Sequence, residues 1–359
     1  MLFDSYKARS LQLSNRTVMS PMTRSRAADA NTPNALMAEY YGQRATAGLI
    51  VTEGTSPSPN GLGYARIPGL FSEEHVAGWK LTTDAVHAKG GKIVIQFMHC
   101  GRVSHVANLP VGAEVVGPSP ETCPGEMYTD SQGMQPHSPP RAMTTEDIAG
   151  SVEEFAEAAR LAVRAGFDGI ELHAANGYLI EQFLNANVNK RTDEYGGSIE
   201  GRNRFALEVA RATVAAIGAD KVGIRLSPYG VFNGTGPYPD VEAQYLALVK
   251  ELSSLKLLYL HVLDHSAMGA PPVPASIKTA LRAAFDGPFI LAGGFDSAAA
   301  AEKALADNQA DLIGIARAFL ANPDLVERLK KGAALNAPDM STFYTPGPKG
   351  YTDYPTLGA

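Results

Sequence analysis

Three polar residues that could polarise a carbonyl group follow one another at the end of a predicted strand. The stretch 169–202 begins with alternating apolar residues and passes through His173, Asn176 and Tyr178 into a helical pattern. A histidine ring and an asparagine amide can both donate to one oxygen. A tyrosine hydroxyl keeps its proton at neutral pH and can deliver it. Each residue alone could equally bond backbone groups or fill the core, but the grouping favours a catalytic site for carbonyl polarisation.

The elements that position these residues read as alternating strands and helices. Short apolar runs cover residues 17–21, 49–53, 92–97, 169–173, 222–227, 259–263, 289–292 and 312–316. Helical periodicity is visible in 73–89, 145–165, 201–217, 240–255, 297–306 and 323–330. Repeated strand–helix alternation gives a parallel sheet, and eight such units close into a barrel. We therefore predict an α/β fold, a (β/α)8 TIM barrel.

Two segments depart from this alternation. Residues 101–143, rich in proline and glycine, follow the third strand. Connections of this length are usually functional, so we expect a capping insertion over the barrel mouth. The tail 333–359 is irregular but contains aromatic residues, so we expect it to pack on the barrel. The prediction is a single domain over residues 1–359 with these two additions.

Glycines and an arginine follow the last two predicted strands. Gly293 and Gly294 end the seventh, while Ala316 and Arg317 end the eighth. The loops after these strands form the recurrent phosphate site of such barrels. Glycine N–H groups can face an anion, and an arginine adds a fork of donors. A tight strand-to-helix turn would also explain the glycine pair.

Gln96 and Arg225 fall near the barrel mouth in the expected strand register. A glutamine amide can donate to and accept from a cyclic imide, and a buried arginine stabilises an anionic ring. With the Thr23 hydroxyl and the glycine loops, this donor set matches a flavin mononucleotide. Two alternatives stay open. Arg225 could pair with Glu171 or Asp264, and Gln96 could bond the backbone inside the barrel.

The composition excludes several other classes of protein. Lys and Arg number 31 against 37 Asp and Glu, and no basic stripe is visible, which argues against nucleic-acid binding. Two cysteines, Cys100 and Cys123, are too few for a disulfide framework, which favours the cytoplasm. No apolar run reaches the roughly 20 residues of a membrane span. His261 and His265 lack a third ligand, so we expect no metal site.

Seven stretches together resemble one known family. They are NRTVMSPMTRSRA (15–27), IQFMHCGR (95–102), HAANGYLIEQFLNANVNKRTDEYGGS (173–198), GIRLSP (223–228), LAGGF (291–295), ARAFLANPDLVERL (316–329) and GYTDYP (350–355). They are similar to the Old Yellow Enzyme family of FMN-dependent ene-reductases over nearly the whole chain. The fourth-strand motif is specific to that family. The likeness is greatest to bacterial xenobiotic reductases such as nitrate ester and N-ethylmaleimide reductases.

The resemblance implies non-covalent FMN with NAD(P)H as reductant. FMN would contact Pro21, Met22, Thr23, Gly54, Gln96, Arg225, Gly293, Gly294, Ala316 and Arg317. His173 and Asn176 would hold the substrate oxygen, and Tyr178 would be the proton donor. The substrate pocket would be lined by Tyr64, Phe232 and Tyr344. Asn176 stands where close relatives often have a second histidine, and both side chains can donate.

The implied reaction is ping-pong reduction of activated C=C bonds in α,β-unsaturated carbonyls, nitroalkenes and maleimides, extending to nitro or nitrate-ester compounds. The partners would be these small molecules and NAD(P)H, in a monomer or homodimer. Two alternatives remain. One is a flavin-free barrel isomerase or aldolase acting on a phosphorylated substrate, against which the lack of a strand-end lysine counts. The other is a flavoprotein that stores or senses FMN without turnover.

Overall fold

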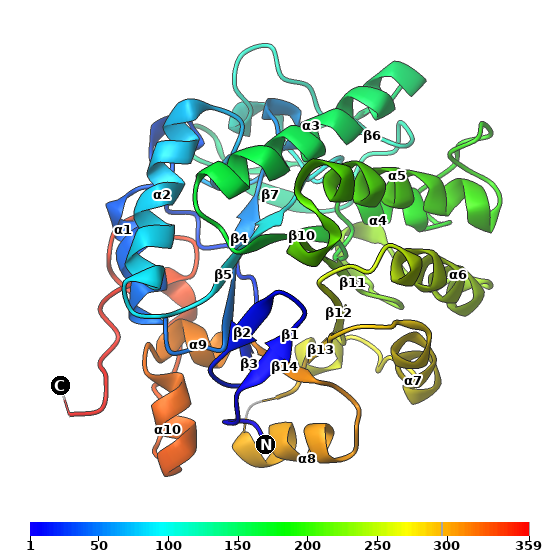
Figure 1. The fold of residues 1–359 in the computed structure, drawn as a ribbon. Helices are drawn as coiled ribbons and strands as arrows, with labels where there is room; N and C mark the ends of the chain where they lie inside the picture. The colour runs from blue at the N-terminus through cyan, green and yellow to red at the C-terminus, as the bar shows by residue number, and fades with distance from the viewer. Residues whose placement is uncertain (296, 359) are drawn as a thin grey trace.

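The centre of the molecule is a closed barrel of eight parallel strands (Figure 1), in a computed structural model that describes residues 1–295 and 297–358. The strands are β3 (Thr17–Met19), β4 (Leu49–Thr55), β5 (Ile93–Phe97), β10 (Gly169–Ala174), β11 (Val222–Leu226), β12 (Tyr259–Leu263), β13 (Phe289–Ala292) and β14 (Leu312–Ile315). They pair in chain order, and β14 returns to β3. The predicted TIM barrel is confirmed.

The helices surround the barrel (Figure 1). They are α1 (Ala35–Gln43), α2 (Glu73–His87), α3 (Thr145–Arg164), α4 (Leu179–Leu184), α5 (Ile199–Ile217), α6 (Val241–Ser254), α7 (Ala275–Ala284), α8 (Ala298–Ala306), α9 (Arg317–Ala321) and α10 (Leu325–Lys331). Each of the six predicted amphipathic helices forms, with ends within two residues of the expected ones. Outward-facing strand residues pack with helix residues in one large apolar cluster, which explains the apolar periodicity of these helices.

Several elements were not predicted from the sequence, among them the five-residue helix α9. Helix α1 contains two adjacent tyrosines and a glycine, which are weak helix formers. Helix α7 buries only Ile277 and Leu281 and follows a proline-rich run, so its apolar pattern is sparse. The hairpin of β1 (Tyr6–Ala8) and β2 (Leu11–Leu13) is too short to show a clear alternation.

The barrel interior changes from apolar to polar along its strands. Leu11 and Leu13 of the hairpin pack with interior residues such as Val94 near the strand starts. Residues two apart share a face of a strand, so Gln96 lies above Val94 inside the barrel. On the neighbouring β10, Glu171 lies beside Gln96 in the strand register. The apolar plug below thus supports polar residues at the barrel mouth.

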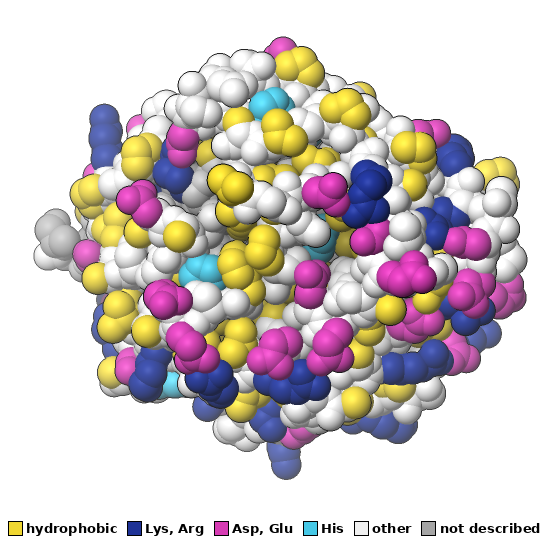
Figure 2. Space-filling view, turned by 90° about the horizontal axis from the view of Figure 1, so that it is seen from above, with side chains coloured by type: hydrophobic (Ala, Val, Ile, Leu, Met, Phe, Trp, Pro, Cys, Tyr) yellow, Lys and Arg dark blue, Asp and Glu magenta, His cyan; other side chains and the backbone are white. Residues whose placement is uncertain are grey.

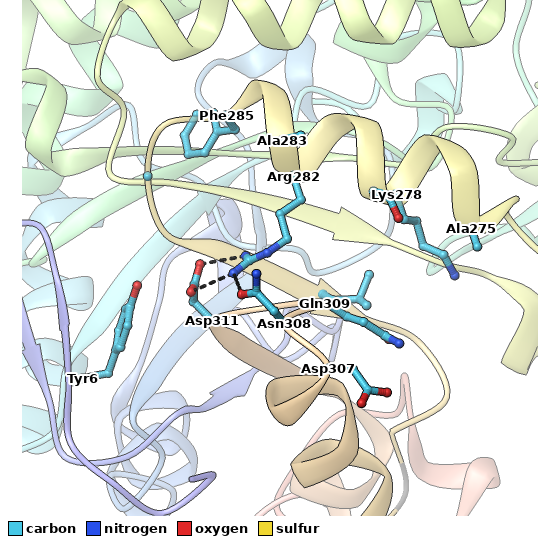
Figure 3. Close-up of a pocket in the computed structure, with 13 residues that line it drawn as sticks. Tyr6, Ala275, Lys278, Arg282, Ala283, Phe285, Asp307, Asn308, Gln309 and Asp311 are labelled. Atoms are coloured by element: carbon cyan, nitrogen blue, oxygen red, sulfur yellow. Dashed lines mark hydrogen bonds and ion pairs between the residues drawn. The ribbon is translucent and has the colours of Figure 1, made fainter.

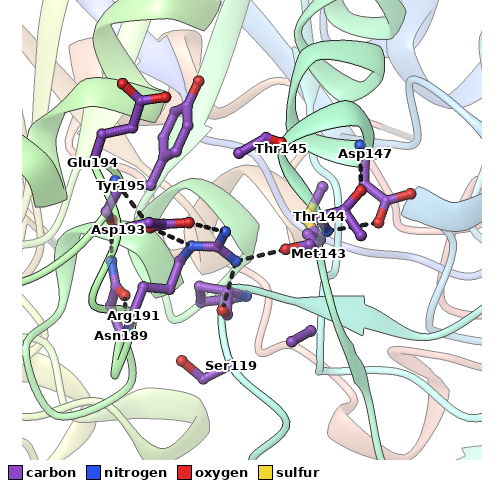
Figure 4. A network of polar contacts seen from close by, with 12 residues as sticks. Ser119, Met143, Thr144, Thr145, Asp147, Asn189, Arg191, Asp193, Glu194 and Tyr195 are labelled. Atoms are coloured by element: carbon purple, nitrogen blue, oxygen red, sulfur yellow. Dashed lines mark hydrogen bonds and ion pairs between the residues drawn. The ribbon is translucent and has the colours of Figure 1, made fainter.

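Residues 101–143 carry small elements of their own. These are β6 (Val116–Gly117), β7 (Glu126–Thr129), β8 (Gly133–Pro136) and β9 (Arg141–Ala142), with β7 and β8 forming an antiparallel hairpin. Arg191 joins the middle of this cap to its carboxyl end, because its Nη1 donates to the carbonyls of Pro118 (3.1 Å) and Met143 (2.6 Å). Asp193 pairs with the same guanidinium (Figure 4). The RTDEYGGS run therefore anchors the cap.

The tail after residue 333 follows the barrel surface; Ala359 lies outside the described residues. Tyr351 is buried and stacks on Tyr40 with ring centroids 4.0 Å apart. Arg24 donates to the carbonyls of Phe343 (3.1 Å) and Gly350 (2.7 Å). These contacts hold the tail beside the segment that follows β3.

Figure 2 shows the molecule from above, with acidic and basic side chains interspersed over this face. The formal net charge is -6. Within residues 1–295 and 297–358, no helix is long and apolar enough to cross a membrane.

Candidate active site at the barrel mouth

The three candidate catalytic residues lie where β10 passes into α4. His173 is the residue before the last one of β10, and Tyr178 is the N-cap of α4. The rings of His173 and Tyr178 meet edge to face with centroids 4.9 Å apart. Asn176 lies on the turn between them. The structure therefore brings the three side chains to one strand–helix junction at the carboxyl end of the barrel.

The turn that carries Asn176 is held by its backbone. Asn176 and Gly177 both have positive φ, 61° and 77°, and asparagine and glycine tolerate this conformation best. The Asn176 N–H donates to Ser227 Oγ (2.9 Å), and Asn233 Nδ2 donates to the Asn176 carbonyl (2.7 Å). The Gly177 N–H donates to Glu181 Oε2 (2.5 Å). The main chain is thus fixed from three sides.

Tyr178 is nearly buried and retains its proton. Its hydroxyl lies 3.1 Å from the hydroxyl of Tyr64, and the two rings meet edge to face. Burial raises the pKa of Tyr178 well above its ordinary value, and Tyr64 adds to the effect. A phenol in this environment is a proton store at neutral pH, and delivering the proton requires an acceptor of high basicity, such as a forming carbanion.

His173 is neutral and has an unpaired ring nitrogen. Burial lowers the pKa of His173 well below its ordinary value, and the nearby Arg225 cation lowers it further. His173 Nδ1 and Arg225 Nε are both buried without a hydrogen-bond partner in the described part of the chain. The two residues are neighbours in the register of β10 and β11. Unpaired buried polar atoms at a barrel mouth suit a polar ligand.

Below them, a buried carboxylate organises the barrel interior. Glu171 accepts from Gln96 Nε2 and from His261 Nδ1, each at 2.8 Å. Burial opposes its ionisation, but His261, Arg225 and the glutamine amide outweigh burial and hold the pKa of Glu171 below its ordinary value. The Gln96 side chain therefore bonds a carboxylate rather than the backbone, and Arg225 is attracted to Glu171. The sequence raised Glu171 only as an alternative partner of Arg225.

The glycine and arginine residues of the predicted phosphate site lie on adjacent loops, because β13 pairs with β14. Gly293 and Gly294 have φ of 114° and 77°. A Cβ on Gly293 would lie 2.0 Å from the Asp264 carbonyl oxygen, so close backbone packing requires this glycine independently of any ligand. Ala316 caps α9, whose first residue, Arg317, is exposed. The loops present backbone groups and one guanidinium on the same side of the barrel.

The remaining cofactor candidates lie on β3 and β4. Residues 21–23 follow β3, which pairs with β14. Gly54 pairs in register with Gln96, after an irregularity in the β4–β5 pairing. A Cβ on Gly54 would lie 2.5 Å from Met98 Sδ, so the Met98 side chain occupies the space above the glycine.

A cavity of about 780 Å³ opens beside Tyr178, and His173 and Asn176 are not among the described residues that line it. Its walls include Thr23, Tyr64, Tyr178, Tyr344 and, from the β7–β8 hairpin, Met127 and Met134. Tyr344 is exposed and reaches the cavity from the tail. Phe232 is not among the described residues that line it; its ring packs instead on His265, with centroids 4.5 Å apart. The cap, the barrel and the tail all contribute to this cavity.

A second cavity, of about 760 Å³, lies between α7 and the loop that precedes β14 (Figure 3). Its charged groups pair with one another or with neighbours: Arg282 donates to Asp311 (2.9 and 3.1 Å), and Lys278 to Asp264 (2.9 Å). Tyr6 and Asp311 lie at the amino-terminal end of the barrel. This cavity is therefore not the site predicted at the strand ends.

Two polar residues of the site received no role from the sequence. Glu181 accepts from the turn at Gly177, and His265 Nε2 lies 2.8 Å from Asn176 Oδ1. His265 was considered only as a metal ligand. Two features of the sequence could have pointed to them: a glutamate lies four residues after Gly177, and a histidine lies just beyond the end of a predicted strand.

Comparison with known proteins assigns the family. The model of the NADH:flavin oxidoreductase / NADH oxidase family matches residues 1–336. The 12-oxophytodienoate reductase 7 of Oryza sativa subsp. japonica is 40% identical, over 99% of this chain and 95% of the relative. A probable flavin mononucleotide-dependent alkene reductase of Leishmania infantum is 42% identical, over 96% and 94%.

Solved structures agree with this assignment. Morphinone reductase superposes with a TM-score of 0.95 at 45% identity, over 99% of this chain and 96% of that one. A further structure of it, in complex with tetrahydroNAD, gives 0.93. The old yellow enzyme homologue from Zymomonas mobilis gives 0.95 at 37% identity, over 99% of both chains. The resemblance to the Old Yellow Enzyme family is confirmed, and a flavin-free isomerase is not supported. The chain belongs to the NADH:flavin oxidoreductase / NADH oxidase family, and its cofactor is FMN.

Proposed function

We propose that the chain reduces C=C bonds activated by a neighbouring carbonyl, nitro or imide group, with NAD(P)H as reductant. One observation supports the proposal: a neutral His173 and a protonated Tyr178 are in ring contact at the junction of β10 and α4, and Asn176 lies on the turn between them. Two donors for an oxygen and one proton source suit conjugate reduction. The alkene reductase named among the relatives supports the same reaction class.

The residues present fit FMN. Arg225 Nε is a buried donor without a partner among the described residues, and it suits the pyrimidine edge of the ring. Glu171 fixes the neighbouring Gln96 amide. The backbone at Gly293 and the exposed Arg317 suit the phosphate. When bound, FMN supplies the hydride that the alkene carbon accepts.

The protein's own residues bind and activate the substrate. His173 and Asn176 donate to the oxygen of the activating group, where negative charge grows as the β-carbon accepts hydride. The donors therefore stabilise the transition state more than the ground state. Tyr178 delivers its proton to the α-carbon, which completes the saturated product. Because burial disfavours a tyrosinate, Tyr178 must regain a proton, and the Tyr64 hydroxyl at 3.1 Å leads to the open cavity.

The test is Tyr178→Phe in stopped-flow kinetics that separate the two half-reactions. We expect flavin reduction by NAD(P)H to persist and enone reduction to slow by roughly 10²–10⁴-fold, as for a lost general acid. Compounds that are reduced at the nitro group itself, which needs no carbon protonation, should be affected less. Tyr195→Phe is the control, because its hydroxyl bonds Glu208 away from the mouth. Equal losses in both half-reactions would reject the role of Tyr178.

Two further points belong to the proposal. A protein that only stores FMN would stay yellow when NAD(P)H is added anaerobically, whereas an enzyme is bleached and recovers colour with an enone, a nitroalkene or a nitrate ester. We also propose a cytoplasmic monomer or homodimer. The support for the compartment is that Cys100 and Cys123 are both free and buried.

A further inference from the structure

His265 follows strand β12 and contacts the candidate site through Asn176. Its Nε2 lies 2.8 Å from Asn176 Oδ1. The ring is 2% exposed and packs on Phe232, with centroids 4.5 Å apart. One polar and one aromatic contact therefore hold the imidazole in place. The sequence did not predict that His265 or Phe232 would help to orient Asn176.

The direction of this hydrogen bond decides what Asn176 can do. A carboxamide has one accepting end and one donating end, and only the donating end can stabilise negative charge on a substrate oxygen. If His265 carries its proton on Nε2, the Nε2–H donates to Asn176 Oδ1. Asn176 Nδ2 is then free to donate to the substrate. The opposite tautomer would bind Nδ2 and turn an oxygen toward the substrate, which would repel the developing charge.

The backbone of Asn176 cannot compensate for a misplaced side chain. Ser227 and Asn233 hold its N–H and carbonyl, and its φ of 61° leaves little freedom. The side-chain torsions are the remaining variables. Burial lowers the pKa of His265 to about 4, with Arg225 as the second cause, so the ring is neutral at neutral pH and one nitrogen carries the proton.

We propose that His265 is a positioning residue whose Nε2–H holds Asn176 Oδ1 and thereby directs the Asn176 Nδ2–H toward the oxygen of the substrate. This inference deepens the proposed function and rests on it for its catalytic consequence. The hydrogen-bond direction itself can be measured without turnover.

A double-mutant cycle tests the catalytic consequence. We expect His265→Met to lower kcat/KM for an enone by about tenfold to a hundredfold, less than the roughly 10²–10³ of a deleted oxyanion donor. In an Asn176→Ala background the same change should have almost no further effect, because the two residues act as one unit. Independent losses that multiply would overturn the proposal.

A matched variant separates hydrogen bonding from packing. His265→Gln has nearly the volume of His265→Met but keeps an N–H donor, so it should recover most of the lost kcat/KM. FMN content and the unfolding midpoint of both variants show whether the fold is intact. Equal activities of the two variants, in folded protein, would contradict a positioning role.

A measurement on the unsubstituted protein covers the case in which His265→Met does not fold. In ¹⁵N-histidine-labelled protein at pH 7, the resonance lost in His265→Gln identifies His265. We expect a proton on Nε2; a proton on Nδ1 would overturn the inference. This readout does not depend on alkene reduction. If the enzyme fails to reduce any enone while Nε2 is protonated, the proposed function fails and the orientation of Asn176 stands.

Discussion

Glu181 provides the sharpest test of how the candidate site is held, because it is a buried carboxyl bonded to the turn at Asn176 and Gly177. It is 1% exposed and accepts from the Gly177 N–H (2.5 Å), the Ser227 hydroxyl (2.9 Å) and the Tyr245 hydroxyl (2.9 Å). Burial outweighs these hydrogen bonds and raises the pKa of Glu181 to about 7. The folded protein therefore holds this proton more tightly than the unfolded chain.

The expected magnitude follows from linkage. The ordinary value is 4.5, and the difference from about 7 corresponds to about 3 kcal/mol. Below pH 4.5 the carboxyl is neutral in both states and contributes no penalty. Between pH 4.5 and 7 the folded state binds more protons than the unfolded state, so stability falls as pH rises. Above pH 7 the full penalty of the buried charge is present.

The perturbation is Glu181→Gln, which mimics the neutral carboxyl, and the assay is urea unfolding of both proteins at pH 5 and pH 8. Subtracting the two unfolding free energies at each pH cancels the titration of all other groups. Because part of the penalty is already present at pH 5, we expect this difference to move by about 2.5 kcal/mol in favour of the variant between pH 5 and pH 8. Glu53, whose pKa burial also raises to about 7, should respond in the same direction. A difference that does not change with pH would refute the reasoning.

Three other substitutions test the supports of the site. Gly293→Ala should lower the unfolding midpoint and weaken FMN retention, because φ is 114° and a Cβ would meet the Asp264 carbonyl; an unchanged midpoint with full FMN would contradict this. Glu171→Leu removes the partner of two buried groups and should cost about 3–5 kcal/mol in urea unfolding, with Glu171→Gln as the milder control. Arg191→Ala should cost about 2 kcal/mol and speed proteolysis within residues 101–143, since two cap carbonyls lose their donor; cleavage at the wild-type rate would argue against the clamp.

The barrel and the core of the site were accessible from the sequence. Buried parallel strands are short apolar runs, and their alternation with amphipathic helices marks the architecture without any knowledge of contacts. His173, Asn176 and Tyr178 lie within six consecutive residues, so a strand followed by a helix is enough to bring them together. The sequence also predicted that glycines and arginines at strand ends would lie near one another, because every strand of such a barrel ends on the same side.

The contacts that orient these residues come from distant parts of the chain. Tyr64 meets Tyr178 across 114 residues, His265 meets Asn176 across 89, and Gln96 meets Glu171 across 75. Sequence periodicity reports which face of an element is buried but not which side chain lies opposite. Closure of the barrel brings these partners within hydrogen-bond distance. It also removes them from water, and that burial determines which groups are neutral, which are charged and which way each hydrogen bond points.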